Sequence, residues 1–200
     1  MVVFQKHMVK YAASPRGAFI GSYEKYSELS AAQIQIYQAC GFSYSPPQPE
    51  AESADYGAHT FTLDGAHICF RVAKTTPTKV GQFVTLWKRV GKGPIQPFDA
   101  VDTPELFVVS ARNGPHFGQF VFPKATLCAH GVVSVHGVGG KRALRVYPPW
   151  DTPVSRQAHA TQAWQLPYFL DVSQDQAVDV ARARQLYLGH PECLGTSVTT

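Results

Sequence analysis

Short apolar runs separated by glycine and proline fill the chain from His59 to Tyr147, and they constrain the fold more than any other feature. Such runs, bounded by these breakers, are typical of β-strands. Strands are therefore predicted at Thr60–Leu63, Ile68–Ala73, Gly81–Lys88, Leu106–Ser110, Gln119–Phe122, Val132–Val135 and Arg142–Tyr147. Only the Arg89–Glu105 connection has the dozen or so residues that a parallel crossover needs, so we expect a mostly antiparallel sheet.

Helical patterns flank this strand-rich centre. Three helix starts carry a capping residue and a favourable partner: Ser30 with Gln33, Thr152 with Pro153, and Ser173 with Gln176. Gly41 stands where the first helix should end. We therefore predict a single α+β domain in which helices flank a central twisted sheet.

Length and composition set further limits. A chain of 200 residues, 44% of them apolar, can bury a core without disulfide or metal staples. No apolar stretch approaches the roughly 20 residues of a membrane span, so no membrane association is expected. The four cysteines form no C-x-x-C pair, which argues against a zinc ribbon or redox pair, and no metal site is predicted. The cytoplasm is the expected location.

Basic residues are clustered, although the net charge of +4 is mild. Six cations and no acid lie in one segment: Arg71, Lys74, Lys79, Lys88, Arg89 and Lys92. A second group comprises Lys141, Arg142 and Arg145. Both clusters could contribute to one basic surface.

The turn between two predicted strands is the first candidate site. Lys74 and Lys79 flank a Thr-Thr-Pro-Thr segment that includes Thr76 and Thr78. Ammonium and hydroxyl groups that converge on a turn suit a phosphate or a carboxylate. A solvated turn with threonines capping its backbone is the alternative.

Aromatic residues accompany the basic ones. Arg145 and Tyr147 share a strand face, and Trp150 follows two prolines, while Trp87 precedes Lys88 and Arg89 at the end of a predicted strand. An arginine beside aromatic rings suits stacking on a base or another planar ligand. A structural tryptophan packed on prolines is the alternative for Trp150.

Carboxylates give only weak catalytic candidates, which are Glu52, Asp102 and Glu105. Acids before a strand that is followed by one ending in lysine resemble a metal-dependent nuclease site. Here Gln119 and Val121 stand where that site needs an acid and a lysine. We expect a binding protein rather than an enzyme. An enzyme of this kind would be a metal-dependent nuclease or hydrolase, and only then would Mg²⁺ be needed, since no cofactor is otherwise predicted.

Several long strings resemble the MepB family of bacterial proteins. They are "FRVAKTTPTKVGQFVTLWKR", "GPIQPFD", "GQFVFPK", "GKRALRVYPPWD" and "QAHATQAWQLPYF", and the likeness extends from about Glu50 to Leu170. The family takes its name from a gene beside a multidrug exporter and is not itself a transporter. The expected division is an N-terminal arm and helix (1–45), a MepB-like core (46–170), and a C-terminal helix and tail (171–200).

The order of strands and helices in the core is also similar to restriction-endonuclease-type folds, which include inactive, DNA-binding relatives. The leading hypothesis is therefore a nucleic-acid-binding protein on a degenerate nuclease-like scaffold. Its expected phosphate contacts are Lys74, Thr76, Thr78, Lys79, Lys88, Arg89, Arg142 and Arg145, with Trp87, Tyr147 and Trp150 as aromatic lining. The alternative is a small-molecule site in which Lys74, Thr78 and Lys79 hold a phosphate or carboxylate and Glu52 or Asp102 is a polar partner. A third hypothesis is an interaction module that docks an acidic protein.

Overall fold

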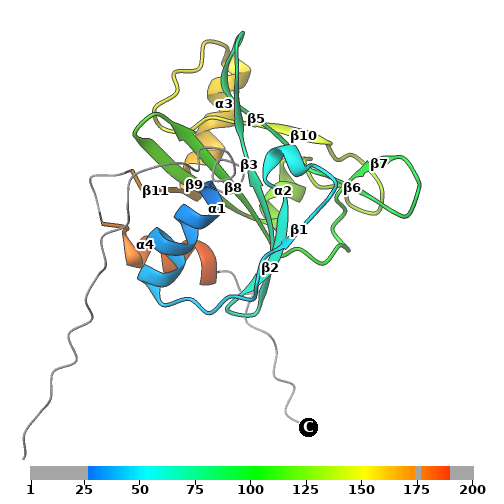
Figure 1. The fold of residues 1–200 in the computed structure, drawn as a ribbon. Helices are drawn as coiled ribbons and strands as arrows, with labels where there is room; N and C mark the ends of the chain where they lie inside the picture. Colours follow the sequence, from blue (N-terminus) through cyan, green and yellow to red (C-terminus); the bar gives the residue numbers. More distant parts are fainter. Residues whose placement is uncertain (1–26, 174–176, 190–200) are drawn as a thin grey trace, which may run out of the picture.

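A mixed six-stranded sheet forms the centre of the protein in the computed structural model, which describes residues 27–173 and 177–189. The strand order is β1 (Gln48–Pro49), β2 (His59–Leu63), β3 (Ala66–Val72), β8 (Leu106–Asn113), β9 (His116–Pro123) and β11 (Phe169–Asp171). All neighbours are antiparallel except β3 and β8, which pair in parallel. The predicted single α+β domain with a mostly antiparallel sheet is confirmed (Figure 1).

A smaller antiparallel sheet has the order β10 (Ala143–Val146), β5 (Lys79–Thr85), β4 (Lys74–Thr76). A two-stranded ribbon follows it, made of β6 (Trp87–Arg89) and β7 (Ile95–Pro97). Strands β4 to β7 all lie in the chain between β3 and β8, so they form part of the crossover that the parallel pair requires.

Helices cover the central sheet from both sides (Figure 1). Helix α1 (Ser27–Ala32), which continues as a π-helical segment (Gln33–Gln38), packs with α4 (Val180–Leu188) on one face. The other face packs against the smaller sheet, α2 (Lys124–Ala129) and α3 (Arg156–Gln165). Short 3₁₀ turns lie at Ala54–Tyr56 and Leu166–Tyr168. None of the helices in the described ranges is long and apolar enough to cross a membrane.

The two-sided cover explains the apolar runs in the central strands. Phe70 and Val108 enter the core beneath α1 and α4, whereas Cys69 and Phe107 enter the core beneath the smaller sheet. Successive side chains of a strand point to opposite faces, so a strand buried on both faces is almost continuously apolar.

Two strand predictions need correction. The segment predicted as one strand, Gly81–Lys88, is two strands, because the chain leaves the smaller sheet at Leu86, whose side chain is buried. The segment Val132–Val135 is not a strand. It makes only isolated bridges, from Ser134 to Asp99 and from Val135 to Val138.

The predicted helix starts are also wrong in position. Ser155 rather than Thr152 caps α3, with its Oγ accepting from the Ala158 amide at 3.1 Å. Asp179 rather than Ser173 caps α4, and Gln176 lies outside the described residues. Ser30 lies inside α1 and does not begin it. Gly41 does follow the first helical segment, with a φ of +69° that favours glycine.

Candidate functional site

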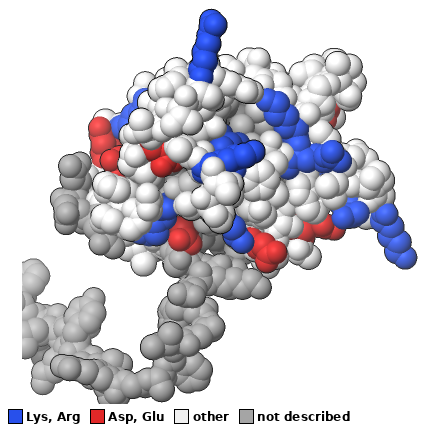
Figure 2. All heavy atoms as spheres, turned by 90° about the horizontal axis from the view of Figure 1, so that it is seen from above, with Lys and Arg blue, Asp and Glu red and all other residues white. Residues whose placement is uncertain are grey.

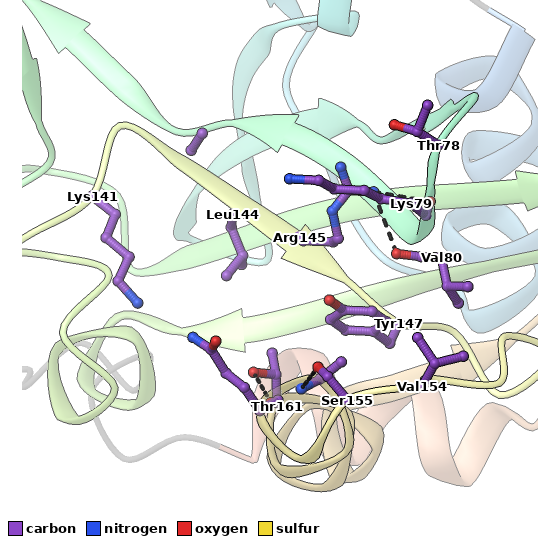
Figure 3. A pocket seen from close by; sticks show the side chains of 13 residues that line it. Thr78, Lys79, Val80, Lys141, Leu144, Arg145, Tyr147, Val154, Ser155 and Thr161 are labelled. Carbon is purple, nitrogen blue, oxygen red and sulfur yellow. Dashed lines mark hydrogen bonds between the residues drawn. The ribbon is translucent and has the colours of Figure 1, made fainter.

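A groove separates the β4–β5 hairpin and β10 on one side from helix α3 on the other (Figure 3). Its volume is about 470 Å³, within the range of roughly 300–1,000 Å³ that is usual for ligand pockets. Three segments line it: Thr78, Lys79 and Val80 of the hairpin; Lys141, Ala143, Leu144, Arg145 and Tyr147 in and around β10; and Val154, Ser155, Gln157, Ala158 and Thr161 in and before α3.

The groove brings together four residues that the sequence singled out. Thr78 lies in the hairpin turn and Lys79 begins β5, whereas Arg145 and Tyr147 belong to β10 and its exit. They meet because β10 pairs with β5, with Arg145 opposite Phe83. Two basic segments that are far apart in the chain therefore share one cavity.

The charge of the groove is entirely of one sign. Lys79, Lys141 and Arg145 line it, and its lining within the described residues contains no carboxylate. Seen from above, the face that carries the hairpin tip and α3 shows Lys and Arg across its middle and right, with most Asp and Glu toward the left and lower margins (Figure 2). Such an arrangement attracts anions.

Arg145 has a structural role in addition to its charge. Its Nη1 donates to the Gly81 carbonyl at 2.8 Å and to the Thr76 hydroxyl at 3.1 Å. These bonds tie β10 to the hairpin turn, so the position of Lys79 depends on the arginine. The guanidinium also lies 6.0 Å from the centre of the Phe83 ring.

Gln165 holds the opposite wall in place. This side chain is completely buried at the end of α3. Its Oε1 accepts from the Tyr147 amide at 2.9 Å, and its Nε2 donates to the Arg145 carbonyl at 3.0 Å. Gln162, one helical turn earlier, donates to the carbonyls of Pro148 and Asp151. The two walls of the groove are therefore joined by four hydrogen bonds, of which the one to the Tyr147 amide is fully buried.

The start of α3 adds a further favourable feature for an anion. Ser155, Gln157 and Ala158 line the groove at the first turn of this helix. Backbone N–H groups at a helix N-terminus lack intrahelical acceptors and carry partial positive charge. Their charge has the same sign as that of the lysines on the opposite wall.

Gly81 allows Tyr147 to close the inner end of the groove. The glycine has a φ of +83°, and a Cβ at this position would lie 2.6 Å from the tyrosine ring and 2.9 Å from the Val146 carbonyl. No larger residue could occupy this position without moving the ring.

The remaining predicted contacts of the first basic cluster point elsewhere. Lys88 forms an ion pair with Asp102, and Arg89 pairs with Glu52 at 2.8 Å. Arg89 also donates to the Gly93 carbonyl. The first cluster is thus partly neutralised by acids from other segments, and neither residue lines the groove.

The three weak catalytic candidates do not share one ligand set. Glu52 and Asp102 are held by those ion pairs, and Glu105 accepts from the His67 amide at 2.5 Å. No group of three or more His, Cys, Asp or Glu in the described part of the chain could hold a metal ion.

Other predicted side chains also lie outside the lining. Lys74 sits 4.9 Å from the centre of the Tyr56 ring. Trp150 stacks on His116 with a ring-centre distance of 5.3 Å. Trp87 lies 5.7 Å beneath the Arg89 guanidinium, and Arg142 is exposed.

Lys141 lines the groove but was not among the phosphate contacts predicted from the sequence. The alternation of side chains along a strand predicts this position. Every second residue lies on the same face of an extended chain, and on this face are Lys141, Ala143, Arg145 and Tyr147. The same alternation places Arg142 on the other face. Nothing in the sequence pointed to α3 as the second wall.

Comparisons with known proteins bear on the family. A family model described as MepB-like matches residues 50–171, more than half of the chain. A solved structure titled "Crystal Structure of MepB" has a TM-score of 0.64 and 29% identity, and the alignment covers 76% of this chain and 99% of that one. The search of curated proteins found no match. The resemblance read from the sequence is confirmed.

Proposed function

We propose that this chain, which belongs to the MepB-like family, binds a nucleic-acid strand by its phosphates in the groove between β10, the β4–β5 hairpin and α3. The observation that carries the proposal is the lining, which holds Lys79, Lys141 and Arg145 without a carboxylate among the described residues. Phosphate contacts by lysine and arginine supply most of the sequence-independent affinity for nucleic acids.

The groove supplies hydrogen-bond donors as well as charge. The Thr78 hydroxyl lies on one wall, and the N-terminus of α3 lies on the opposite wall. Hydroxyls, backbone amides and helix N-termini are common phosphate contacts in nucleic-acid complexes. The single aromatic ring in the lining, that of Tyr147, is largely buried. Recognition of the strand should therefore depend on its backbone more than on stacking of its bases.

A salt-dependent titration tests the proposal. Short labelled single-stranded DNA, duplex DNA and single-stranded RNA are titrated with the full chain, and binding is followed by fluorescence anisotropy at several salt concentrations. We expect binding at low salt and a linear fall of log K with log salt, because counterions are released from the neutralised phosphates. Absence of binding to all three at low salt would overturn the proposal.

The double variant Lys79→Ala with Lys141→Ala locates the site. Each lost phosphate contact should reduce the salt slope by about 0.7 for a single strand, so the pair should reduce it by about 1.4. The control is Lys92→Ala, an exposed lysine on the β6–β7 hairpin outside the groove lining. If the control and a single groove variant change the slope equally, the groove is not the site.

A compact phosphate-bearing small molecule is the second candidate. Lys88 and Arg89 are paired with acids, and this observation favours the second candidate. The lining cations then lie in one cavity and do not form an extended basic surface along which a strand could bind. Nucleoside monophosphates and pyrophosphate distinguish the two candidates when they compete with the labelled strand. A free nucleotide that binds the wild type more tightly than any strand, and loses binding in the double variant, would favour this second candidate.

We also propose a cytoplasmic location and a binding role without catalysis. Two buried cysteines, Cys40 and Cys69, are free thiols, which suits a reducing compartment. Incubation of labelled DNA with the protein and Mg²⁺ or Mn²⁺ tests the catalytic part, since strand cleavage would contradict a purely binding role.

A further inference from the structure

We infer that a second cavity, which shares no residue with the groove, is a binding site for a neutral, polyhydroxylated small molecule of about monosaccharide size. This cavity of about 420 Å³ lies at the β1–β2 edge of the central sheet, against the segment that leads from β7 to β8. Its polar lining includes the hydroxyls of Thr60, Thr62 and Thr103 and the carboxylates of Glu50 and Asp102, and Phe98 and Pro104 add apolar surface.

Both carboxylates that line this cavity are ion-paired. Glu50 pairs with Arg71 at 2.5 Å, and Asp102 pairs with Lys88. Lys124 also donates from Nζ to the Asp102 carbonyl at 2.7 Å. A charged ligand would gain little here, whereas a neutral one would leave every ion pair intact.

The hydrogen-bonding groups that remain suit hydroxyls. Among the described residues, none of the three threonine hydroxyls has a hydrogen-bond partner. Each can both donate and accept, and an ion-paired carboxylate retains lone pairs that accept from a ligand O–H. The side of a sugar ring that carries C–H groups could lie against Phe98 and Pro104. A few placed polar groups beside apolar surface are typical of small-molecule sites.

The walls are already fixed in position. The Thr62 amide donates to Ser45 Oγ at 3.0 Å, which joins the segment before β1 to β2. The Glu105 amide donates to the His67 carbonyl, and the His67 amide donates to the Glu105 carboxylate. The Asp99 amide donates to Asp102 Oδ2 at 2.7 Å. A ligand would bind without ordering a loop, which lowers the free-energy cost of binding.

Titration of the full chain with a set of small probes tests this inference. The neutral probes are ribose, glucose and myo-inositol, the cationic probe is spermidine, and the anionic probe is inorganic phosphate. Binding is measured by ligand-observed NMR. We expect at least one neutral polyol to bind, and neither spermidine nor phosphate to compete with it. Failure of every polyol to bind, or displacement of a bound polyol by spermidine, would overturn the inference.

Variants assign any binding to this cavity. Thr60→Val and Thr62→Val remove hydroxyls and keep the β-branched shape that suits β2, so each should weaken polyol binding at least tenfold. The matched control Thr152→Val changes an exposed threonine outside both cavities and should leave binding unaltered. If the β2 variants fold poorly, Thr103→Val in the exposed loop gives the same test. The groove double variant Lys79→Ala with Lys141→Ala should retain polyol binding, which separates this site from the proposed nucleic-acid site. Unchanged affinity in all three threonine variants would overturn the assignment.

Discussion

Replacement of Gln165 by leucine should destabilise the protein and disturb the groove. Leucine has nearly the same volume as glutamine but makes no hydrogen bonds, so the change tests the two bonds to β10 without opening a large cavity. The Tyr147 amide would be left buried without its 2.9 Å partner, and the Arg145 carbonyl would lose its 3.0 Å partner in a partly buried position. An unsatisfied buried group costs about 1–3 kcal/mol, and with the second group discounted for its solvent access the total is about 2–4 kcal/mol.

Urea denaturation followed by circular dichroism measures this loss as a lower midpoint with an unchanged slope. The matched control is Gln157→Leu, at an exposed position in the first turn of the same helix, where the effect should stay within about 0.5 kcal/mol. Gln165→Leu should also weaken nucleic-acid binding, because the hydrogen bonds from Gln165 no longer join the two walls of the groove. If Gln165→Leu is as stable as the wild type, the two hydrogen bonds do not hold α3 against β10, and the reasoning is refuted.

Three further predictions concern stability. Gly81→Ala forces a side chain into a φ of +83° and to 2.6 Å from the Tyr147 ring, so unfolding free energy should fall by about 2 kcal/mol, and a fall below about 0.5 would contradict the clash. Hydrogen bonds from the Ser134 hydroxyl and the Gly137 amide lower the pKa of Asp99 from its ordinary 3.8 to about 2. A lowered pKa stabilises the fold above pH 4, and this contribution is lost as the pH falls toward 2. Asp99→Asn should therefore reduce the loss of stability between pH 4 and pH 2, measured as the melting temperature at each pH. An unchanged loss of stability would show that other carboxylates cause it. Glu50→Gln removes the charge that compensates a buried arginine and should cost about 2 kcal/mol, whereas Glu52→Gln, at an exposed pair, should cost less than about 1 kcal/mol. Equal costs in chemical denaturation would contradict the role of burial.

The sequence predicted the fold class because its signal is local. Strand segments such as Leu106–Ser110 are apolar runs bounded by breakers, and their existence does not depend on which neighbours they acquire. Pairing is not local, and the parallel contact of β3 with β8 joins Ile68 to Leu106 across the whole crossover. No pattern within either strand specifies that partner. The break at Leu86 was missed for the same reason, since only the course of β10 shows where β5 must end.

The groove was predicted in part. The turn residues Thr78 and Lys79 and the pair Arg145 and Tyr147 carry recognisable chemistry, and the structure places them together. Lys88, in contrast, was predicted as a phosphate contact and lies against Asp102. A run of cations in sequence does not reveal acids that arrive from other segments, so pairing of charges can be read only from the fold.

Helix starts were misplaced because several capping residues compete in each segment. Thr152 and Ser155 both precede α3, and both can accept a backbone N–H. Thr152 and Pro153 belong to the segment that connects β10 to α3. The helix begins at a position from which Gln162 and Gln165 can bond to backbone groups of residues 145–151. Tertiary contacts thus select among local signals of similar strength.

The position of the β4–β5 hairpin within the crossover between β3 and β8 has a consequence for how this family can diversify. The ends of the crossover are fixed by the parallel pair, whereas the hairpin tip around Thr78 is exposed and free of the central sheet. Doubling the length of a flexible loop costs only about 0.6 kcal/mol in closure entropy. Insertions at this tip would change the depth and charge of the groove while both central strands keep their register. Ligand preference could therefore change between relatives in a segment whose length the core does not constrain.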